Sequence, residues 1–472
     1  MNIKASCTPI FFIGIGGIGM SAIARYFLLH GFKVGGYDRT ESHITRALVA
    51  EGAEVFYTDS SDSIPETFRS ETTYVIYTPA VPADSSVMSY YREHGIPLYK
   101  RSQALGEITS HSKALCVAGT HGKTTTSTIL ACLMARTVSP SEYVGVNAFL
   151  GGISLNYNSN LLLDAEASFT VAEADEYDRS FHTLHPHYAI ITSSSPDHLD
   201  IYGTEEAYLE AFSHFTSLIS PEGGLVIHKH ATCTPRLQKG AKCYTYAKEE
   251  QADFYSDNLQ FRSGELYFDF HFPGGVYKEM HIGVPIAINV ENATAALAVA
   301  HLCGKSEVEL RHNLSAFKGV HRRFERVLSG AEGEPVLIDD YAHHPEEIAA
   351  SIRSVRILYP KSRLTAIFQP HLYSRTADFY KEFAESLSQE AQVVLLPIYP
   401  AREEPIPGVT SELILEHISS NVTATCCSKA ELTSTLDRFP ADVYLMLGAG
   451  DIELLVPEVK DYLIQKNKKA LS

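Results

Sequence analysis

Residues 115–134 read LCVAGTHGKTTTSTILACLM, and this stretch decides the fold class. An apolar strand pattern runs into a short glycine-containing loop, and a helix pattern follows at once. In such strand–loop–helix units, the loop amides cradle phosphate oxygens, a lysine reaches the β- and γ-phosphates and a hydroxyl binds Mg²⁺. The stretch therefore predicts a nucleoside triphosphate site in an α/β domain.

The loop departs from the general G-x-x-x-x-G-K-[ST] motif at one position, because Val117 stands where the motif has glycine. The preceding strand and the three threonines after Lys123 still favour a phosphate site over a chance Gly-Lys turn. We predict that Lys123 binds the terminal phosphates and that Thr124 binds Mg²⁺. The full predicted triphosphate loop is Gly119, Thr120, His121, Gly122, Lys123, Thr124 and Thr125.

Strand and helix patterns alternate throughout the chain, which predicts an α/β fold with mainly parallel sheets. A length of 472 residues suggests about three domains. We place the boundaries at 1–107, 108–317 and 318–472.

A second glycine loop follows the apolar strand at residues 10–13, and it fits G-x-G-x-x-G. Such a loop lets a diphosphate approach backbone amides at a helix N-terminus, and an acid after the next strand can bind a ribose hydroxyl. NAD is the usual ligand, although the next segment shows no hydride-transfer groups. The residues predicted to bind this nucleotide are Gly14, Gly16, Gly17, Ile18, Gly19 and Asp38.

Acidic and imidazole side chains follow two strand patterns downstream of the lysine loop. Residues 167–181 read ASFTVAEADEYDRSF and residues 189–202 read AIITSSSPDHLDIY. We expect a strand–helix–strand unit that brings Glu173 and His198 to one sheet edge. Together with Thr124, they are the predicted metal ligands. Thr124 and Glu173 offer the hard oxygens that suit Mg²⁺, which also keeps waters and substrate phosphates, and His198 adds an imidazole.

The composition and charge of the chain limit the kinds of molecule that it is expected to bind. A formal net charge of -17 argues against nonspecific binding to nucleic acid or membrane. No apolar run reaches the roughly 20 residues of a membrane span. Eight scattered cysteines are typical of reduced thiols in a cytosolic protein. We therefore expect a cytoplasmic protein.

Nine segments together resemble the Mur ligase family, in family order from residue 11 to about residue 411. They read FFIGIGGIGMSAIA, AGTHGKTTT, EADEYDRSF, PDHLDIY, NVENATAALAVA, GVHRRFE, DDYAHHPEEI, FQPHLYSRT and EEPIPGVTSE. The resemblance implies an N-terminal Rossmann-like domain that binds a UDP-sugar, a central P-loop-type ATPase domain and a C-terminal Rossmann-like domain that binds an amino acid. The first glycine loop would then bind the UDP diphosphate rather than NAD.

The resemblance also implies the activity, which is ATP-dependent amide formation through an acyl-phosphate. It implies ATP and Mg²⁺ as cofactors and UDP-N-acetylmuramate and L-alanine as substrates. We expect a monomer or homodimer. A free carboxylate is a poor acylating agent, and phosphoryl transfer turns it into a mixed anhydride by positioning and charge neutralisation.

Further site residues come from the resemblance alone. Asn289 and Asn292 match the family's paired asparagines, and an amide such as that of Asn292 suits the adenine edge. Arg323 and Asp340 match residues that face ATP. Tyr341, His343 and Arg375 match the amino-acid side, where Arg375 could grip a carboxylate. The predicted catalytic set is Lys123, Glu173, His198, Arg323, Asp340 and His343.

Some alternatives stay open. Either His198 or His343 could accept the proton of the amine. Arg322 and Arg323 are adjacent, so we expect one to point to solvent, and the motif favours Arg323 as the functional one. Ile288 replaces a histidine that the family often has there. Rival functions are a peptide-recycling ligase, an NAD-dependent oxidoreductase and a non-catalytic nucleotide-binding regulator. The absence of lysine between His198 and Lys229 fits an alanine-adding ligase.

Overall fold

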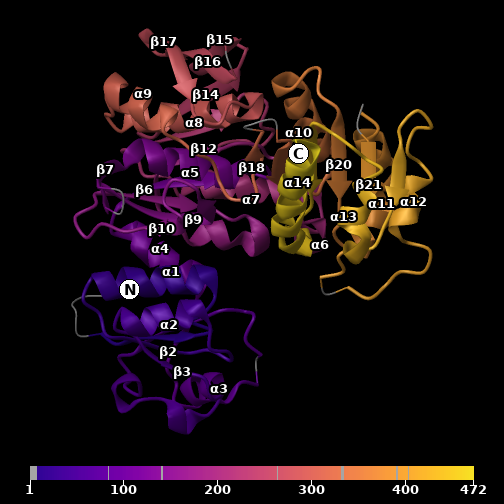
Figure 1. Ribbon diagram of the computed structural model, residues 1–472. Coiled ribbons are helices and arrows are strands. Elements are labelled where there is room, and N and C mark those ends of the chain that lie inside the picture. Colours follow the sequence, from indigo (N-terminus) through magenta and orange to yellow (C-terminus); the bar gives the residue numbers. More distant parts are fainter. Residues whose placement is uncertain are drawn as a thin grey trace. The chain divides into compact units, whose positions relative to one another are not determined.

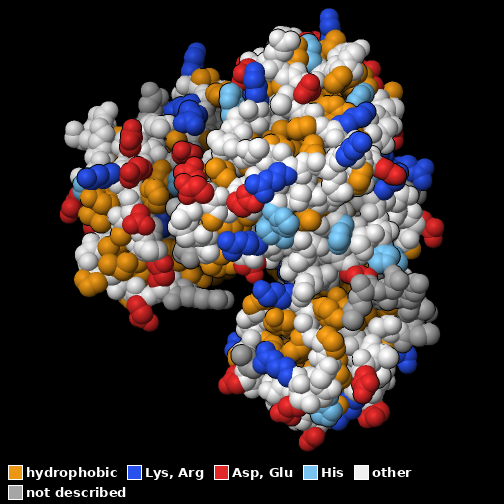
Figure 2. All heavy atoms as spheres, turned by 180° about the vertical axis from the view of Figure 1, so that it is seen from behind, with side chains coloured by type: hydrophobic (Ala, Val, Ile, Leu, Met, Phe, Trp, Pro, Cys, Tyr) orange, Lys and Arg blue, Asp and Glu red, His pale blue; other side chains and the backbone are white. Residues whose placement is uncertain are grey.

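The computed structural model describes residues 8–82, 84–139, 142–262, 264–330, 334–389, 392–401 and 403–471. The chain forms two compact units, residues 1–283 with 289–318 and residues 284–288 with 319–472. Within the described ranges, no helix has the length and apolar character needed to cross a membrane. On the face shown in Figure 2, side chains of both charges are interspersed with apolar ones.

The first unit begins with a five-stranded parallel sheet (Figure 1). Its order is β3 (Glu54–Phe56), β2 (Val34–Tyr37), β1 (Ile10–Ile13), β4 (Tyr74–Tyr77) and β5 (Leu98–Lys100). Its helices are α1 (Ile18–Leu29), α2 (His43–Ala50), α3 (Ser86–Glu93) and α4 (Arg101–Ser110), with short 3-10 turns η1 (Ser61–Ser63) and η2 (Glu66–Phe68). The strand order reverses at β1, and ligands of open α/β sheets bind at such a point.

A ten-stranded sheet follows in the same unit. Its order is β10 (Ser159–Leu162), β9 (Val146–Ser154), β11 (Phe169–Glu173), β6 (Lys113–Ala118), β12 (Pro186–Ile191), β13 (Gly224–His228), β14 (Lys242–Lys248), β15 (Phe254–Arg262), β16 (Glu265–Phe272) and β17 (Gly275–Ile282). In this sheet order, the strands from β9 through β11, β6, β12, β13 and β14 to β15 pair in parallel. Strands β10, β16 and β17 pair antiparallel at the two ends of the sheet. The remaining elements are α5 (Lys123–Met134), α6 (Leu199–Tyr202), α7 (Glu205–Ser217), α8 (Ala287–Leu302), α9 (Glu307–Ser315) and the hairpin β7 (Arg136–Ser139) with β8 (Glu142–Val144).

The central strand β6 lies between β11 and β12, and this order positions the site. Glu173 pairs in register with Val117, and Ile191 with Ala118, so three strands end at one edge. The expected helix between β11 and β12 is wrong. The connection is a 3-10 segment, η3 (Tyr177–Thr183), in which Asp178 and Arg179 take left-handed backbone angles of 49° and 60° in φ.

The second unit contains a six-stranded sheet in which only β18 runs antiparallel to its neighbour. Its order is β18 (Glu325–Ser329), β19 (Val336–Asp340), β23 (Val443–Leu447), β20 (Leu364–Phe368), β21 (Gln392–Leu395) and β22 (Ala424–Cys426). The helices are α10 (Pro345–Leu358), α11 (Tyr373–Leu387), α12 (Ser411–Leu415), α13 (Leu432–Thr435) and α14 (Val456–Leu471), with 3-10 turns η5 (Lys429–Glu431) and η6 (Asp451–Leu455). The predicted α/β class with mainly parallel sheets is therefore confirmed.

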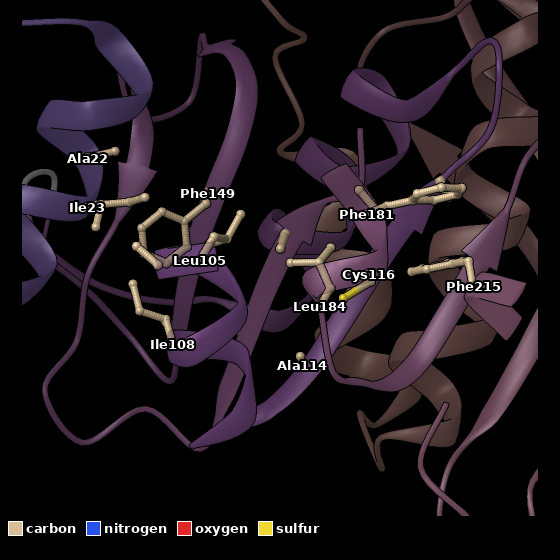
Figure 3. Packing of buried hydrophobic residues seen from close by; sticks show 14 of the residues in the cluster. Ala22, Ile23, Leu105, Ile108, Ala114, Cys116, Phe149, Phe181, Leu184 and Phe215 are labelled. Atoms are coloured by element: carbon tan, nitrogen blue, oxygen red, sulfur yellow. The ribbon is translucent and has the colours of Figure 1, made fainter. Parts of the chain in front are cut away.

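A buried apolar cluster joins the two sheets of the first unit (Figure 3). Ile23 of α1 and Leu105 of α4 lie beside Phe149 of β9 in this cluster, while Phe181 stacks on Phe215 at 4.8 Å between ring centroids. Helix α4 also packs on η3, because Gly106 allows close approach to the backbone of Thr183. The segment after β11 is therefore packed into this apolar cluster.

Replacing Gly106 with alanine tests this close approach. A Cβ atom at Gly106 would lie 2.2 Å from the carbonyl oxygen of Thr183, which is backbone and cannot swing aside. We expect Gly106→Ala to cost roughly 1–3 kcal/mol, as overpacking does in cores. Thermal unfolding should show a midpoint several degrees lower. Ser110→Ala, at an exposed position of the same helix, is the control, and equal midpoints for the two variants would contradict the packing described.

Candidate active site

The loop between β6 and α5 is confined on two sides. Gly119 has a φ of 135°, and a Cβ there would lie 2.1 Å from Oγ1 of Thr192. Gly122 has a φ of 81°, and a Cβ there would lie 2.8 Å from Oδ1 of Asn292. Only glycine combines these backbone angles with such close neighbours. The loop is therefore held in one shape by β12 on one side and α8 on the other.

Hydroxyls after β12 hold the same loop, a role that the sequence analysis did not predict. The backbone N–H of His121 donates to Oγ of Ser193 at 3.0 Å, and Oγ1 of Thr192 donates to the carbonyl of His121 at 2.5 Å. Oγ1 of Thr120 donates to the carbonyl of Ser195 at 2.6 Å. The run TSSS at residues 192–195 is thus the support of the phosphate loop.

Lys123 begins α5, and its ammonium is folded back on the loop. Nζ donates to the carbonyls of Gly119 and Thr120 at 2.7 and 3.3 Å, and to Oε1 of Glu176 at 2.8 Å. Burial raises the pKa of Glu176, while the charge of Lys123 opposes that shift. The sequence showed Glu176 only as one acid in a cluster, so its contact with the lysine was missed.

Thr124 and Glu173 meet beside the lysine, as predicted. Oγ1 of Thr124 donates to Oε1 of Glu173 at 3.2 Å, and Oε2 of Glu173 accepts from the N–H of Gly151 at 3.1 Å. Nε2 of His198 lies 3.9 Å from Oε1 of Glu176. Among the described residues, no three Asp, Glu, His or Cys side chains form a metal cluster. The hydroxyl and carboxylate still suit Mg²⁺, which takes few protein ligands besides waters and phosphates.

The paired asparagines lie at the start of α8, and both are buried. Oδ1 of Asn292 accepts from Oγ1 of Thr126 at 3.2 Å, so Asn292 ties α8 to α5 next to Gly122. Ile288, where the family often has histidine, is 43% exposed. Asn292 is therefore beside the phosphate loop and also bears on its shape.

In the first glycine loop, the predicted acid Asp38 is hydrogen-bonded to the loop itself. Oδ2 of Asp38 accepts from the N–H of Gly16 at 2.8 Å, and Oδ1 accepts from the N–H of Thr40 at 3.2 Å. The predicted ribose ligand is thus already bonded to the loop. Gly19 instead faces Arg101, whose Nη1 would lie 3.0 Å from a Cβ at Gly19. Arg101 is a cation at this loop that the sequence did not point out.

Within the first unit, a cavity of about 110 Å³ lies between this glycine loop and the acids Glu173 and Asp175. Its lining includes Gly19, Arg101, Phe149, Gly151, Glu173 and Asp175. A ligand in this cavity would touch both α1 and the carboxylate that Thr124 bonds.

The second unit separates the two adjacent arginines. Arg322 is 6% exposed, and its guanidinium lies 2.8 Å from a carboxylate oxygen of Glu453 and 3.5 Å from one of Asp339. Arg323 is half-buried and lies over the ring of Tyr341, 4.8 Å from its centroid. The expectation that one arginine would point to solvent is wrong in detail, because Arg322 is buried in ion pairs and Arg323 stacks on an aromatic ring.

Asp340 lies at the end of β19 beside Arg323. Its Oδ1 accepts from the N–H of Phe324 at 3.2 Å, and its Oδ2 accepts from the hydroxyl of Ser351. Burial raises the pKa of Asp340 to about 6, although the Ser351 hydroxyl and the Arg323 charge act in the opposite direction. The carboxylate is therefore held by backbone and hydroxyl while a cation lies nearby.

His343 is a neutral imidazole at the same strand end. Its Nδ1 lies 2.9 Å from the carbonyl of Tyr341, so this nitrogen carries the proton and Nε2 carries the lone pair. The pKa of His343 is lowered to about 4, chiefly by burial and with a contribution from the charge of Arg375, while Glu347 acts in the opposite direction. Of the predicted amino-acid group, His343 thus contacts Tyr341 through a hydrogen bond to its carbonyl and lies close enough to Arg375 to feel its charge.

A glycine-containing loop between a strand and a helix, followed by a lysine and a hydroxyl with an acid beside them, is typical of a P-loop-type phosphoryl-transfer enzyme. Comparison with known proteins narrows this class. Residues 9–113 match the Mur ligase family catalytic domain, residues 117–300 the Mur ligase middle domain, and residues 322–458 the Mur ligase glutamate ligase domain. The chain belongs to the Mur ligase family and is an ATP-dependent ligase. This membership rules out the NAD-dependent oxidoreductase.

Relatives match over almost their whole length. The chain is 55% identical to the UDP-N-acetylmuramate--L-alanine ligase of Porphyromonas gingivalis, covering 96% of this chain and 98% of that one. It is 50% identical to the enzyme of that name from Phocaeicola vulgatus, covering 97% and 98%. The crystal structure of UDP-N-acetylmuramate-alanine ligase MurC from Thermotoga maritima matches with a TM-score of 0.77 at 26% identity, covering 98% and 99%. A murein peptide ligase from Psychrobacter arcticus shares the fold, with a TM-score of 0.62 at 20% identity, covering 97% and 98%.

The neutral state of His343 predicts a pH dependence of stability. Its pKa falls from 6.5 to about 4 on folding, so the unfolded chain binds the proton more tightly and the wild type loses stability as the pH falls from about 6.5 to about 4. The shift corresponds to roughly 3 kcal/mol at most. We expect His343→Gln to lose less stability over this range. Unfolding midpoints of both proteins between pH 4 and 8 measure the difference, and a gap that does not change with pH would contradict the burial of a neutral imidazole.

Proposed function

We propose that the protein joins L-alanine to the lactyl carboxylate of UDP-N-acetylmuramate through an acyl-phosphate, with release of ADP and phosphate, in peptidoglycan precursor synthesis. One observation carries this proposal: the cavity beside the α1 glycine loop is lined by Glu173, which bonds Thr124 of the phosphate loop. A carboxylate on a nucleotide-linked sugar held at α1 would then meet the terminal phosphate of ATP. The relatives that share half or more of their residues with this chain carry the same activity in their names.

We assign three domains, 1–107 for the UDP-sugar, 108–317 for ATP and 318–472 for the amino acid. The UDP diphosphate would bind the amides of the loop from Gly14 to Gly19. Arg101 supplies a cation beside that loop, and Asp38 holds the loop in shape through Gly16. We place the protein in the cytoplasm, as a monomer or homodimer.

Charge neutralisation is the main task of the ATP side, because an anionic carboxylate must approach an anionic phosphate. Lys123 and Arg323 are the cations proposed for this task, and electrostatic groups already in place lower such barriers most. Mg²⁺, when bound, supplies further positive charge at the phosphate oxygens. Thr124, Glu173 and His198 would hold it. Asn289 and Asn292 would bind the adenosine side, and Asp340 would orient Arg323.

The amine must attack as a free base, so a group has to accept its proton. His198 would give its lone pair to the cation, which leaves His343 as the proton acceptor. The lone pair on Nε2 is available because Nδ1 faces the carbonyl of Tyr341. With a pKa of about 4, His343 stays unprotonated near neutral pH, so its lone pair is free to accept a hydrogen bond from the amine. Arg375, whose charge acts on His343, would bind the carboxylate of the amino acid.

The activity is tested by phosphate release from ATP, Mg²⁺ and UDP-N-acetylmuramate with single amino acids. We expect release of phosphate and ADP with L-alanine. The variant Lys123→Ala should lower the rate at least about a hundredfold, because a preorganised cation at the transferred group is removed. Formation of AMP, or a normal rate in Lys123→Ala, would refute the mechanism. Release only with a peptide in place of L-alanine would instead indicate the recycling ligase.

The metal assignment is tested at the hydroxyl of Thr124. Thr124→Val keeps the shape of the side chain and removes the oxygen, so the Mg²⁺ concentration for half-maximal rate should rise by about tenfold. Thr124→Ser restores the hydroxyl and should restore the wild-type Mg²⁺ requirement. An unchanged Mg²⁺ requirement in Thr124→Val would show that this hydroxyl does not bind the cation.

A further inference from the structure

Glu176 is a buried carboxylate at the phosphate loop that the mechanism above does not use. Its side chain is 1% exposed, and it lies on the segment between β11 and η3. Its backbone carbonyl accepts from the hydroxyl of Tyr202, and its N-terminal neighbour Asp175 holds the N–H of Tyr177 through Oδ1 at 3.0 Å. The backbone on both sides of Glu176 is thus fixed, and its side chain points at the lysine.

The ammonium of Lys123 has no donor left for a phosphate. An ammonium carries three N–H groups, and three oxygens accept from Nζ, those of Gly119, Thr120 and Glu176. Two of the acceptors are neutral carbonyls, and the third is a carboxylate. A charge-assisted hydrogen bond is about twice as strong as a neutral one, so Glu176 is the strongest competitor for this lysine.

The carboxylate of Glu176 has fewer hydrogen-bond partners than the ammonium of Lys123. Oε2 of Glu176 is buried and has no hydrogen-bond partner among the described residues. The nearest other cationic candidate is His198, with Nε2 at 3.9 Å from Oε1. A buried carboxylate loses much when its cationic partner leaves. The pair therefore resists any ligand that draws Lys123 outward.

We propose that Glu176 is a positioning residue that holds the ammonium of Lys123 against its own loop until a nucleotide polyphosphate displaces it. This inference rests on the proposed role of Lys123 at the terminal phosphates of ATP. Every nucleotide that recruits Lys123 must break the contact with Glu176. After phosphoryl transfer, Glu176 recaptures the lysine, and this return weakens the hold on ADP.

The test is nucleotide affinity, measured by calorimetry with ADP and with a non-hydrolysable ATP analogue. Glu176→Gln keeps the shape and an acceptor oxygen but removes the charge, so both ligands should bind roughly tenfold more tightly. In steady-state assays the KM for ATP should fall, and inhibition by ADP should become tighter. Equal or weaker binding by Glu176→Gln would overturn the proposal.

Asp178→Asn is the matched control. Asp178 carries the same charge on the same segment, yet its partner is Lys100 at 3.5 Å rather than Lys123. Nucleotide affinity should stay within about twofold of wild type, as expected for a surface charge. A gain equal to that of Glu176→Gln would show a general charge effect and overturn the proposal.

A double-mutant cycle ties the effect to the lysine. On a Lys123→Ala background, Glu176→Gln should give no gain in affinity, and a gain that persists there would refute the inference. Glu176→Asp, which retracts the carboxylate by one methylene, should give a smaller gain and serves if the glutamine variant unfolds. These binding measurements are independent of ligase turnover, so their failure is distinguishable from failure of the proposed reaction.

Discussion

The fixed shape of the loop from Gly119 to Gly122 is the constraint on which the site depends. Thr192 and Asn292 lie so close to its two glycines that no side chain fits at either position. The helix that follows is buried on almost every side, and Ser127 and Thr128 both donate to the carbonyl of Thr124, at 3.1 and 2.7 Å. The loop and the first turn of α5 therefore form one rigid piece, with the positive end of the helix dipole at its tip.

The sequence predicted the parts of this site that depend on strand ends. Lys123 and Thr124 follow β6, and Glu173 ends β11, so their meeting at one sheet edge follows from parallel pairing of neighbouring strands. Glu176 could not be predicted in the same way. The segment after it turns at Asp178 and Arg179, two residues other than glycine with positive φ, and no sequence pattern marks such angles. The expected helix failed for the same reason.

Adjacent residues of one type show a second limit of sequence reasoning. Arg322 and Arg323 are chemically identical, and the motif alone favoured Arg323. In the structure both guanidinium groups lie over the ring of Tyr341, 5.2 Å from its centroid for Arg322 and 4.8 Å for Arg323, and Arg322 is in addition buried and ion-paired to Asp339 and Glu453. The two arginines therefore differ in burial and in ion pairs within the second unit, which no sequence pattern marks. Asp38 shows the same limit, because the hydrogen bond from the N–H of Gly16 to one of its oxygens is visible only in the folded structure.

Because the whole chain is strongly acidic, the binding of anionic ligands depends on individual cationic side chains. A net charge of -17 repels anionic ligands at long range, although salt screens charges beyond roughly 8 Å under physiological conditions. Anions must therefore be bound by cations at contact distance. At the loop between β6 and α5 that cation is Lys123, and its pairing with a buried carboxylate leaves little net positive charge there. A single phosphate finds a neutral pair there, whereas a polyphosphate that also uses the loop amides and the helix dipole can separate the pair. Discrimination for nucleotides over smaller anions then follows from the same contact that keeps the lysine in place.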